Sequence, residues 1–403
     1  MQSNWRIGSL FGIPLYIDSS WFIILAFVTI INAGDLNATG LSQGNPLLGW
    51  ITGLMMALLL FASVLLHELG HSLVAKAQGI EVNSITLFLF GGVASIERES
   101  DTPTQAFQVA IAGPLVSMAL FGLFKGMTQF LGEYSLLQVL TSDLARINLV
   151  IGIFNLIPGL PLDGGQVFKA LVWKLTGDRF IGVHWASASG KLIGWFGISV
   201  GLFFVLLTGE IGAIWLVLIS WFVLRNANAY DQLTTIQQAL LEIVAAEVMT
   251  RDFRVVDANL SLRAFAEEYV VSELFVNMPY FAASEGRYRG LVVISDLHSI
   301  ERSEWETKTL AQIAHPLTEI PSVREGTLLV EVINQLEKIS DSRITVLSPA
   351  GAVAGIIDRG DIVKAIASKQ NLEIPEAEIK RIKAEGSYPD RLQLQAIAKT
   401  IKE

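Results

Sequence analysis

The chain contains no cysteine and only five histidines among its 403 residues. The lack of cysteine excludes disulfide bonds and thiolate ligands, so histidine and carboxylate are the strong metal ligands that remain. Charged residues are also scarce, at 17%, and the net charge is −9. An acidic chain without a basic surface does not favour nucleic acid as a partner.

Long hydrophobic runs fill the first half of the chain, where charge is sparse. Hydrophobic residues make up 52% of the sequence, and its mean hydropathy of +0.50 is too high for an average soluble protein. After about residue 225 the composition becomes that of an ordinary globular protein. The sequence therefore predicts a multipass α-helical membrane domain followed by a soluble α/β domain. The predicted membrane spans are residues 19–33, 47–77, 105–131, 144–174, 185–207 and 211–224.

The basic residues of the membrane half are distributed unequally between the two sides of the membrane that these spans define. Eight lie on one side and two on the other. Because cytoplasmic loops carry an excess of lysine and arginine, both termini and the soluble domain are predicted to be cytoplasmic. We also expect no cleavable signal peptide, because no small-residue cleavage site follows the first apolar run.

The pentad H-E-L-G-H, residues 67–71, lies near the end of the second predicted span. On a helix its two histidines lie one turn apart on one face, where both can bind one zinc ion. Glu68 lies beside them and can accept a proton from a water that the metal activates. The alternative is a pair of buried core histidines, but such polar residues are costly at membrane depth and functional by default.

A catalytic zinc needs a third protein ligand and one open position. His184, in a polar loop between two predicted spans, is one candidate, and an ordinary interfacial histidine is the alternative for it. Asp163 is the better candidate, because it lies in the run N-L-I-P-G-L-P-L-D-G-G at residues 155–165. Two prolines stop a regular helix there, and two glycines permit a tight turn after the acid.

The pentad and this second motif together resemble the site-2 protease family of intramembrane zinc metalloproteases. The resemblance covers residues 1–225 and implies that His67, His71 and Asp163 bind one Zn²⁺, with Glu68 as the general base. It implies an endopeptidase that cuts peptide bonds within or near membrane-spanning segments of other proteins. Asn155 is then a candidate donor to the substrate or the oxyanion, or else a packing amide.

Residues 82–90 are predicted to form a β-strand that ends at Gly91 and Gly92. An exposed strand edge could pair with an extended substrate and hold it over the metal. The alternative is a structural hairpin in which the glycines only make the turn.

The soluble half contains an internal repeat with a period near 65 residues. Residues 226–245 are predicted as a linker, 246–367 resemble a tandem pair of CBS domains, and 368–403 form a charged C-terminal tail. In that family an acid at the position of Asp296 and Asp361 often binds an adenosine nucleotide. Val293 and Asp358 replace the hydroxyl residue of the motif, so helix capping is the favoured alternative for both acids. The pair could instead support a homodimer or gate the substrate.

A CBS-regulated metal-ion transporter is the main alternative function, because intramembrane histidine and aspartate could form a transit site. Glu68 argues against it, since transit needs no base beside two helix-spaced histidines. A second alternative is an inactive membrane scaffold, but an intact set of metal ligands and base argues against it. Zinc is favoured by the ligand types, although iron, cobalt or manganese could bind the same groups in vitro.

Overall fold

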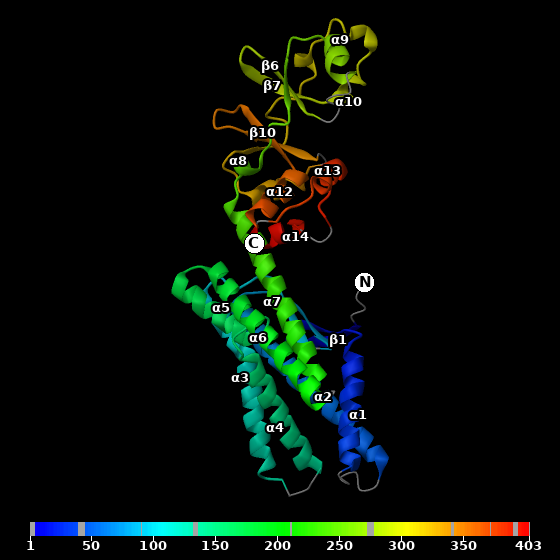
Figure 1. Cartoon of the computed structure of the whole chain (residues 1–403), viewed down its shortest axis with the longest axis vertical. Coiled ribbons are helices and arrows are strands. Elements are labelled where there is room, and N and C mark those ends of the chain that lie inside the picture. Colours follow the sequence, from blue (N-terminus) through cyan, green and yellow to red (C-terminus); the bar gives the residue numbers. More distant parts are fainter. Residues whose placement is uncertain are drawn as a thin grey trace. The chain divides into compact units, whose positions relative to one another are not determined.

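The structure is a computed structural model in two units, Met1–Thr234 and Thr235–Glu403 (Figure 1). It describes residues 5–38, 45–89, 91–131, 136–209, 212–271, 278–339, 342–370, 372–389 and 394–402.

The first unit is a bundle of apolar helices. Among the described residues, five helices are long and apolar enough to cross a membrane: α2 (Pro46–Ala77), α3 (Pro103–Thr128), α4 (Leu136–Asn155), α6 (Arg179–Thr208) and α7 (Gly212–Glu242). Helix α1 (Trp21–Ala38) is a shorter apolar helix before them. The chain is therefore an integral membrane protein, and the predicted fold class is confirmed.

The predicted span 144–174 is not one element. Helix α4 ends at Asn155, a non-helical segment follows at 156–162, and α5 (Asp163–Thr176) begins at the acid itself. The two prolines of the segment explain the break, because proline cannot continue a helix. Helix α7 runs past the predicted span 211–224, of which Ile211 lies outside the described residues, and contains most of the predicted linker.

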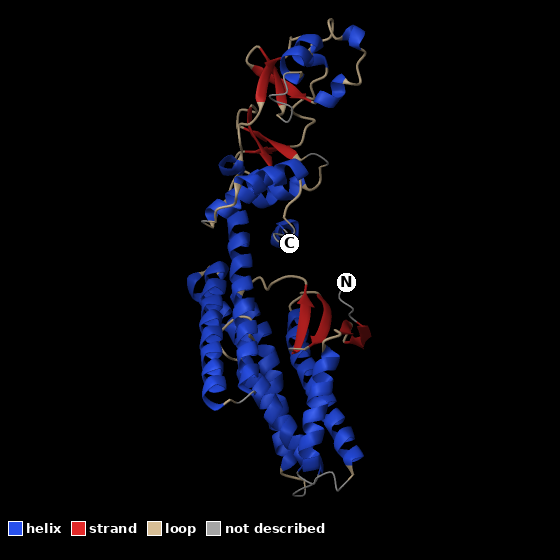
Figure 2. Ribbon diagram, turned by 45° about the vertical axis from the view of Figure 1, so that its right-hand side comes forward, coloured by secondary structure: helices blue, strands red, loops and turns tan. Residues whose placement is uncertain are grey.

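A small sheet packs on the C-terminal half of α2 (Figure 2). Its strands are β1 (Trp5–Leu10), β2 (Ile13–Ile17), β3 (Val82–Phe88) and β4 (Gly91–Ile96), in the order β1-β2-β3-β4. β2 and β3 are parallel, and the two outer pairs are antiparallel. The buried residues that join the sheet to α2 are Ile13, Leu15, Leu69, Ala75, Ile80, Val82 and Ile85. The strand predicted at 82–90 is confirmed as far as Phe88, and Phe90 lies outside the described residues.

In its described residues, the second unit contains two three-stranded sheets with the same pairing. In each, the first strand is parallel to the second, and the second is antiparallel to the third. The strands are β5 (Arg254–Asp257), β6 (Tyr280–Ser284) and β7 (Arg287–Val292), then β8 (Ser322–Arg324), β9 (Arg343–Leu347) and β10 (Val353–Asp358). The helices are α8 (Ala245–Val248), α9 (Leu262–Phe265), α10 (Ile294–Leu297), α11 (Leu329–Leu336), α12 (Arg359–Lys369), α13 (Glu376–Glu385) and α14 (Leu394–Lys402). This repetition corresponds to the internal repeat of the sequence.

The C-terminal tail packs into the second sheet's core. Helix α13 packs against α12 and α14 against α11, and Ile382 and Leu394 are buried there. Lys383 Nζ lies 2.6 Å from Asp361 Oδ1 and 3.3 Å from Asp358 Oδ2. Burial lowers the pKa of Lys383, but the hydrogen bond to Asp361 and the charge of Asp358 outweigh it and hold this pKa above 10.5. The negative charges of the two buried carboxylates are therefore compensated by the same lysine.

Replacing Lys383 with methionine is expected to destabilise the second unit by about 3 kcal/mol, because two buried carboxylates lose their cation. In the wild type this stabilisation is fully present at pH values below 10.5, the ordinary lysine value, at which both carboxylates are ionised, and it is lost as the pH rises through the raised pKa of Lys383. Hydrogen exchange of α12 and α13 in the full-length protein measures the loss. Lys380→Met, on an exposed position of the same helix, is the control. Equal protection in both variants would contradict the prediction.

Candidate metal centre

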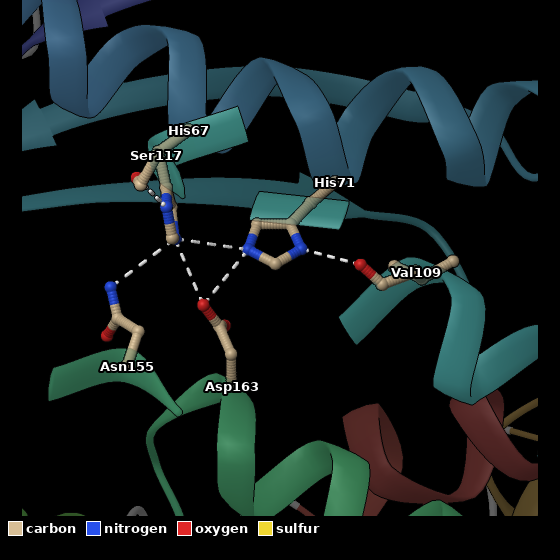
Figure 3. A network of polar contacts seen from close by, with 6 residues as sticks. All are labelled: His67, His71, Val109, Ser117, Asn155 and Asp163. Carbon is tan, nitrogen blue, oxygen red and sulfur yellow. Dashed lines mark hydrogen bonds and ion pairs between the residues drawn. The ribbon is translucent and has the colours of Figure 1, made fainter. Parts of the chain in front are cut away.

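Three side chains from two helices bring their ligand atoms together (Figure 3). His67 and His71 lie on α2, and Asp163 is the first residue of α5. The Nε2 atom of His67 is 3.0 Å from Asp163 Oδ2, and that of His71 is 3.3 Å from the same oxygen. The two Nε2 atoms are 3.3 Å apart. Among the described residues, this is the one cluster of three that could hold a metal ion.

The residues present fit a zinc ion. Nitrogen and oxygen ligands lie about 2.0–2.2 Å from zinc, so the corners of a tetrahedral site lie about 3.4 Å apart. The separations of 3.0 and 3.3 Å observed here are close to that value. The donor set of two imidazoles and one carboxylate is also one that zinc takes in catalytic sites.

The position of the two histidines along α2 determines how far the site lies from the end of this helix. His67 lies ten residues before the end of this helix at Ala77, about 15 Å along its axis. Both histidines are buried, at 3% and 8% exposure. Gly70, between them, allows α3 to come close, because a Cβ there would lie 3.1 Å from the carbonyl oxygen of Ala112.

The segment 156–162 aims Asp163 at the histidines. The backbone N–H of Leu160 donates to the carbonyl of Ala186 on α6, which anchors the segment to that helix. A Cβ on Gly164 would lie 2.2 Å from the carbonyl oxygen of Leu156, and one on Gly165 would lie 2.3 Å from the carbonyl carbon of Gly159. The two glycines were predicted to make a turn after the acid, but they lie in the first turn of α5. They are needed because the backbone of the segment packs directly against them.

Glu68 lies between the histidines and the sheet. A Cβ on Gly92 would be 2.5 Å from Glu68 Cγ, so β4 runs against the glutamate side chain. Asn155 is also close, because its Nδ2 atom is 3.4 Å from His67 Nε2. The structure thus brings Glu68, Asn155 and Gly92 to the metal cluster.

Other contacts of the two imidazoles come from α3, which sequence reasoning did not identify. Ser117 Oγ is 2.9 Å from His67 Nδ1, and the carbonyl oxygen of Val109 is 2.7 Å from His71 Nδ1. The sequence gives only a weak indication of these contacts. It consists of the spacing of Val109 and Ser117, which lie four residues before and after Gly113 on α3.

The remaining candidate residues lie outside the metal cluster. His184 Nδ1 is 2.5 Å from Asp231 Oδ1 on α7, so this histidine pairs with an aspartate of the bundle. Asp296 Oδ2 is 2.6 Å from His315 Nε2. Asp361 is buried and accepts from the backbone N–H of Asp358, which is the N-cap residue of α12. Neither Asp296 nor Asp361 is itself the N-cap of its helix.

The sequence of this chain matches known families and proteins. The model of peptidase family M50 matches residues 55–144 and 133–184, and the CBS domain model matches residues 311–368. A Synechocystis sp. protein named as a zinc metalloprotease is 41% identical over 91% of this chain and 96% of its own length. A similarly named Mycobacterium tuberculosis protein, Rip3, is 31% identical over 91% of this chain and 93% of its own length. The solved site-2 protease of Methanocaldococcus jannaschii is 32% identical, with a TM-score of 0.41, over 57% of this chain and 95% of that one.

The two curated relatives extend over nearly the whole chain, through both the membrane helices and the second unit. The family model spans the pentad and Asp163, the residues that the structure brings together. The chain therefore belongs to peptidase family M50, the site-2 protease family of zinc metalloproteases, and carries a CBS domain after its membrane helices.

Proposed function

We propose that this protein is an intramembrane zinc endopeptidase that hydrolyses peptide bonds within or near transmembrane segments of other membrane proteins. The observation that carries the proposal is the cluster of His67, His71 and Asp163 beside Glu68. The two histidines and Glu68 lie on α2, a helix long enough to cross the membrane. A hydrolytic site in such a helix meets substrates that themselves lie in the lipid bilayer.

The side chains around the cluster supply the proton transfers. Zinc, when bound, would act as a Lewis acid that polarises the scissile carbonyl and acidifies a water. Glu68 accepts the proton of this water as its oxygen attacks the carbonyl carbon, and then delivers the proton to the leaving amine. Asn155 Nδ2, 3.4 Å from His67 Nε2, is a neutral donor for the oxyanion or the substrate backbone.

Strand β4 is the proposed substrate-binding edge. It is the last strand in the sheet order, so one of its edges has no partner strand among the described residues. An unwound substrate segment could add to this edge as a further strand, with its scissile amide next to Glu68. Gly91 begins the strand at φ +136°, a conformation that residues with a side chain rarely adopt. Gly92 keeps the strand in contact with Glu68.

Gly92→Ala is expected to lower the cleavage rate about 100-fold and to leave zinc binding unchanged. Its Cβ would displace Glu68, and displacement of a catalytic group by about 1 Å costs a factor of this size. Cleavage rate and zinc content of the purified variant measure the two effects. Gly34→Ala, where a Cβ meets nothing within 4 Å, is the control. Loss of zinc together with activity would show that Gly92 supports the ligands rather than Glu68.

Both termini and the CBS domain are proposed to be cytoplasmic. The unequal distribution of basic residues supports this orientation. Lys76 Nζ donates to the carbonyl oxygen of Phe11, which lies between β1 and β2. Lys169 Nζ is 3.7 Å from Oε2 of Glu99, which lies between β4 and α3. These two lysines therefore lie near the segments that precede and follow α2. Protease accessibility of tags at each terminus in sealed vesicles tests the orientation.

We propose that a CBS pair at 246–367 regulates cleavage, as a nucleotide sensor or as a homodimer contact. Helix α7 is continuous from Gly212 to Glu242, and its last turns contribute Ala239 and Leu240 to the core of the second unit. Two residues are candidates for binding a nucleotide. Asp296 is partly exposed and pairs with His315, whereas Asp361 forms an ion pair with Lys383. Calorimetry of the full-length protein with ATP, ADP and AMP tests the first role, and its mass in detergent tests the second.

The proposed activity is tested with a panel of single-span membrane proteins in detergent. The wild-type protein should cleave at least one of them, a zinc chelator should stop cleavage, and added Zn²⁺ should restore it. Cleavage that persists in a zinc-free preparation would contradict the proposal.

A further inference from the structure

One face of α3 meets both imidazoles of the metal cluster. Val109, Gly113 and Ser117 are spaced four residues apart, so they lie one above the other along the helix. The carbonyl oxygen of Val109 is 2.7 Å from His71 Nδ1, and Ser117 Oγ is 2.9 Å from His67 Nδ1 (Figure 3). Ser117 is fully buried, at 0% exposure. Each histidine thus has its own partner on this helix.

These contacts determine which ring nitrogen is free for a metal. A backbone carbonyl only accepts hydrogen bonds, so His71 carries a proton on Nδ1, and in the neutral, metal-binding form of the ring the lone pair is on Nε2. A serine hydroxyl can accept in the same way from Nδ1 of His67. In both rings the Nε2 atom then faces Asp163 Oδ2, at 3.0 and 3.3 Å. Partners of this kind fix the tautomer and orientation of metal-binding histidines.

Gly113 lies between these two contacts and leaves room for the rings. A Cβ at this position would be 2.2 Å from His71 Nε2 and 2.7 Å from His67 Nε2. Both distances are too short for non-bonded atoms, and the atoms concerned are the ligand nitrogens. Any side chain here would therefore occupy the space beside the ligands.

We propose that α3 is a positioning element of the metal site: Ser117 and the Val109 carbonyl orient the two histidines, and Gly113 keeps the space beside their Nε2 atoms open. These residues bind no metal themselves and act through His67 and His71. The inference rests on zinc binding by the proposed active site.

Zinc affinity of the purified full-length protein, measured by competition with a chromophoric chelator, tests this role. Ser117→Ala is expected to bind Zn²⁺ at least about tenfold more weakly than the wild type, the usual effect of removing such a partner. Ser72→Ala is the matched control, because Ser72 is on α2 and is also at 0% exposure, and its hydroxyl has no hydrogen-bond partner among the residues that the structure describes. The visible spectrum of the Co²⁺-substituted protein should change in Ser117→Ala alone, since it reports ligand geometry.

Two further comparisons separate the hydroxyl from the packing. Ser117→Thr and Ser117→Val have nearly the same shape, and only the threonine should keep tight zinc binding. Gly113→Ala should lose zinc, whereas Gly122→Ala, on an open position of the same helix, should keep it. Wild-type affinity in Ser117→Ala, or equal affinity in the threonine and valine variants, would overturn the role of Ser117. If the wild type itself binds no zinc, or Asp163→Ala binds it as tightly as the wild type, the proposed active site fails instead.

Discussion

Asp163→Ala is expected to abolish stoichiometric zinc binding and all cleavage while the protein stays folded. The carboxylate is one of three groups in the metal cluster, and its Oδ2 atom is 3.0 Å from His67 Nε2 and 3.3 Å from His71 Nε2. Two histidines alone leave zinc one protein ligand short of a catalytic site. Metal analysis of the purified variant, together with its thermal unfolding in detergent, measures the effect.

Asp143→Ala is the control for this variant. Asp143 lies in α4 of the same unit, and its carboxylate pairs with the exposed Arg146 at 2.9 Å. Its removal should change neither the zinc content nor the cleavage rate. One zinc per molecule of Asp163→Ala would remove this residue from the site.

Glu68→Gln is expected to keep one zinc per molecule and to lose cleavage by a factor of about 10³. Glutamine preserves the shape of the side chain but cannot accept the proton of the attacking water, and a general base contributes about 10²–10⁴-fold. The variant therefore separates metal binding from catalysis, which Asp163→Ala does not. Single-turnover cleavage of a single-span substrate is the measurement.

Glu81→Gln, at an exposed position after α2, controls for the substitution itself. It should cleave at the wild-type rate. If Glu68→Gln also cleaves at the wild-type rate, then either Glu68 is not the base or a contaminating protease makes the cut.

The cluster of three candidate ligands could be predicted from the sequence because its signals are local. His67 and His71 are four residues apart on one helix, and helical periodicity alone places them together. Asp163 was predicted from its prolines and glycines and from the family resemblance, and the three ligand atoms do lie within 4.8 Å of one another. The bundle of apolar helices was predicted by the same kind of local evidence, the length of the hydrophobic runs.

Features that depend on how helices pack were not predicted. Ser117 contacts His67 across fifty residues of sequence, and the residues around Ser117 carry only a weak signal for this contact. Gly164 and Gly165 were predicted as turn residues, because their sequence cannot show the backbone of 156–162 that packs on them. Lys383 lies in a tail for which no role was predicted, yet it bridges Asp358 and Asp361.

The position of the bond that is cut distinguishes an intramembrane protease from a protease of soluble segments and from a transporter. The wild-type protein and a single-span substrate are reconstituted together in lipid vesicles, and the products are sized by mass spectrometry. We expect a cut within or next to the apolar segment of the substrate, by the wild type and not by Glu68→Gln. Cuts confined to the soluble flanks, or zinc flux across the vesicle without any cut, would contradict it.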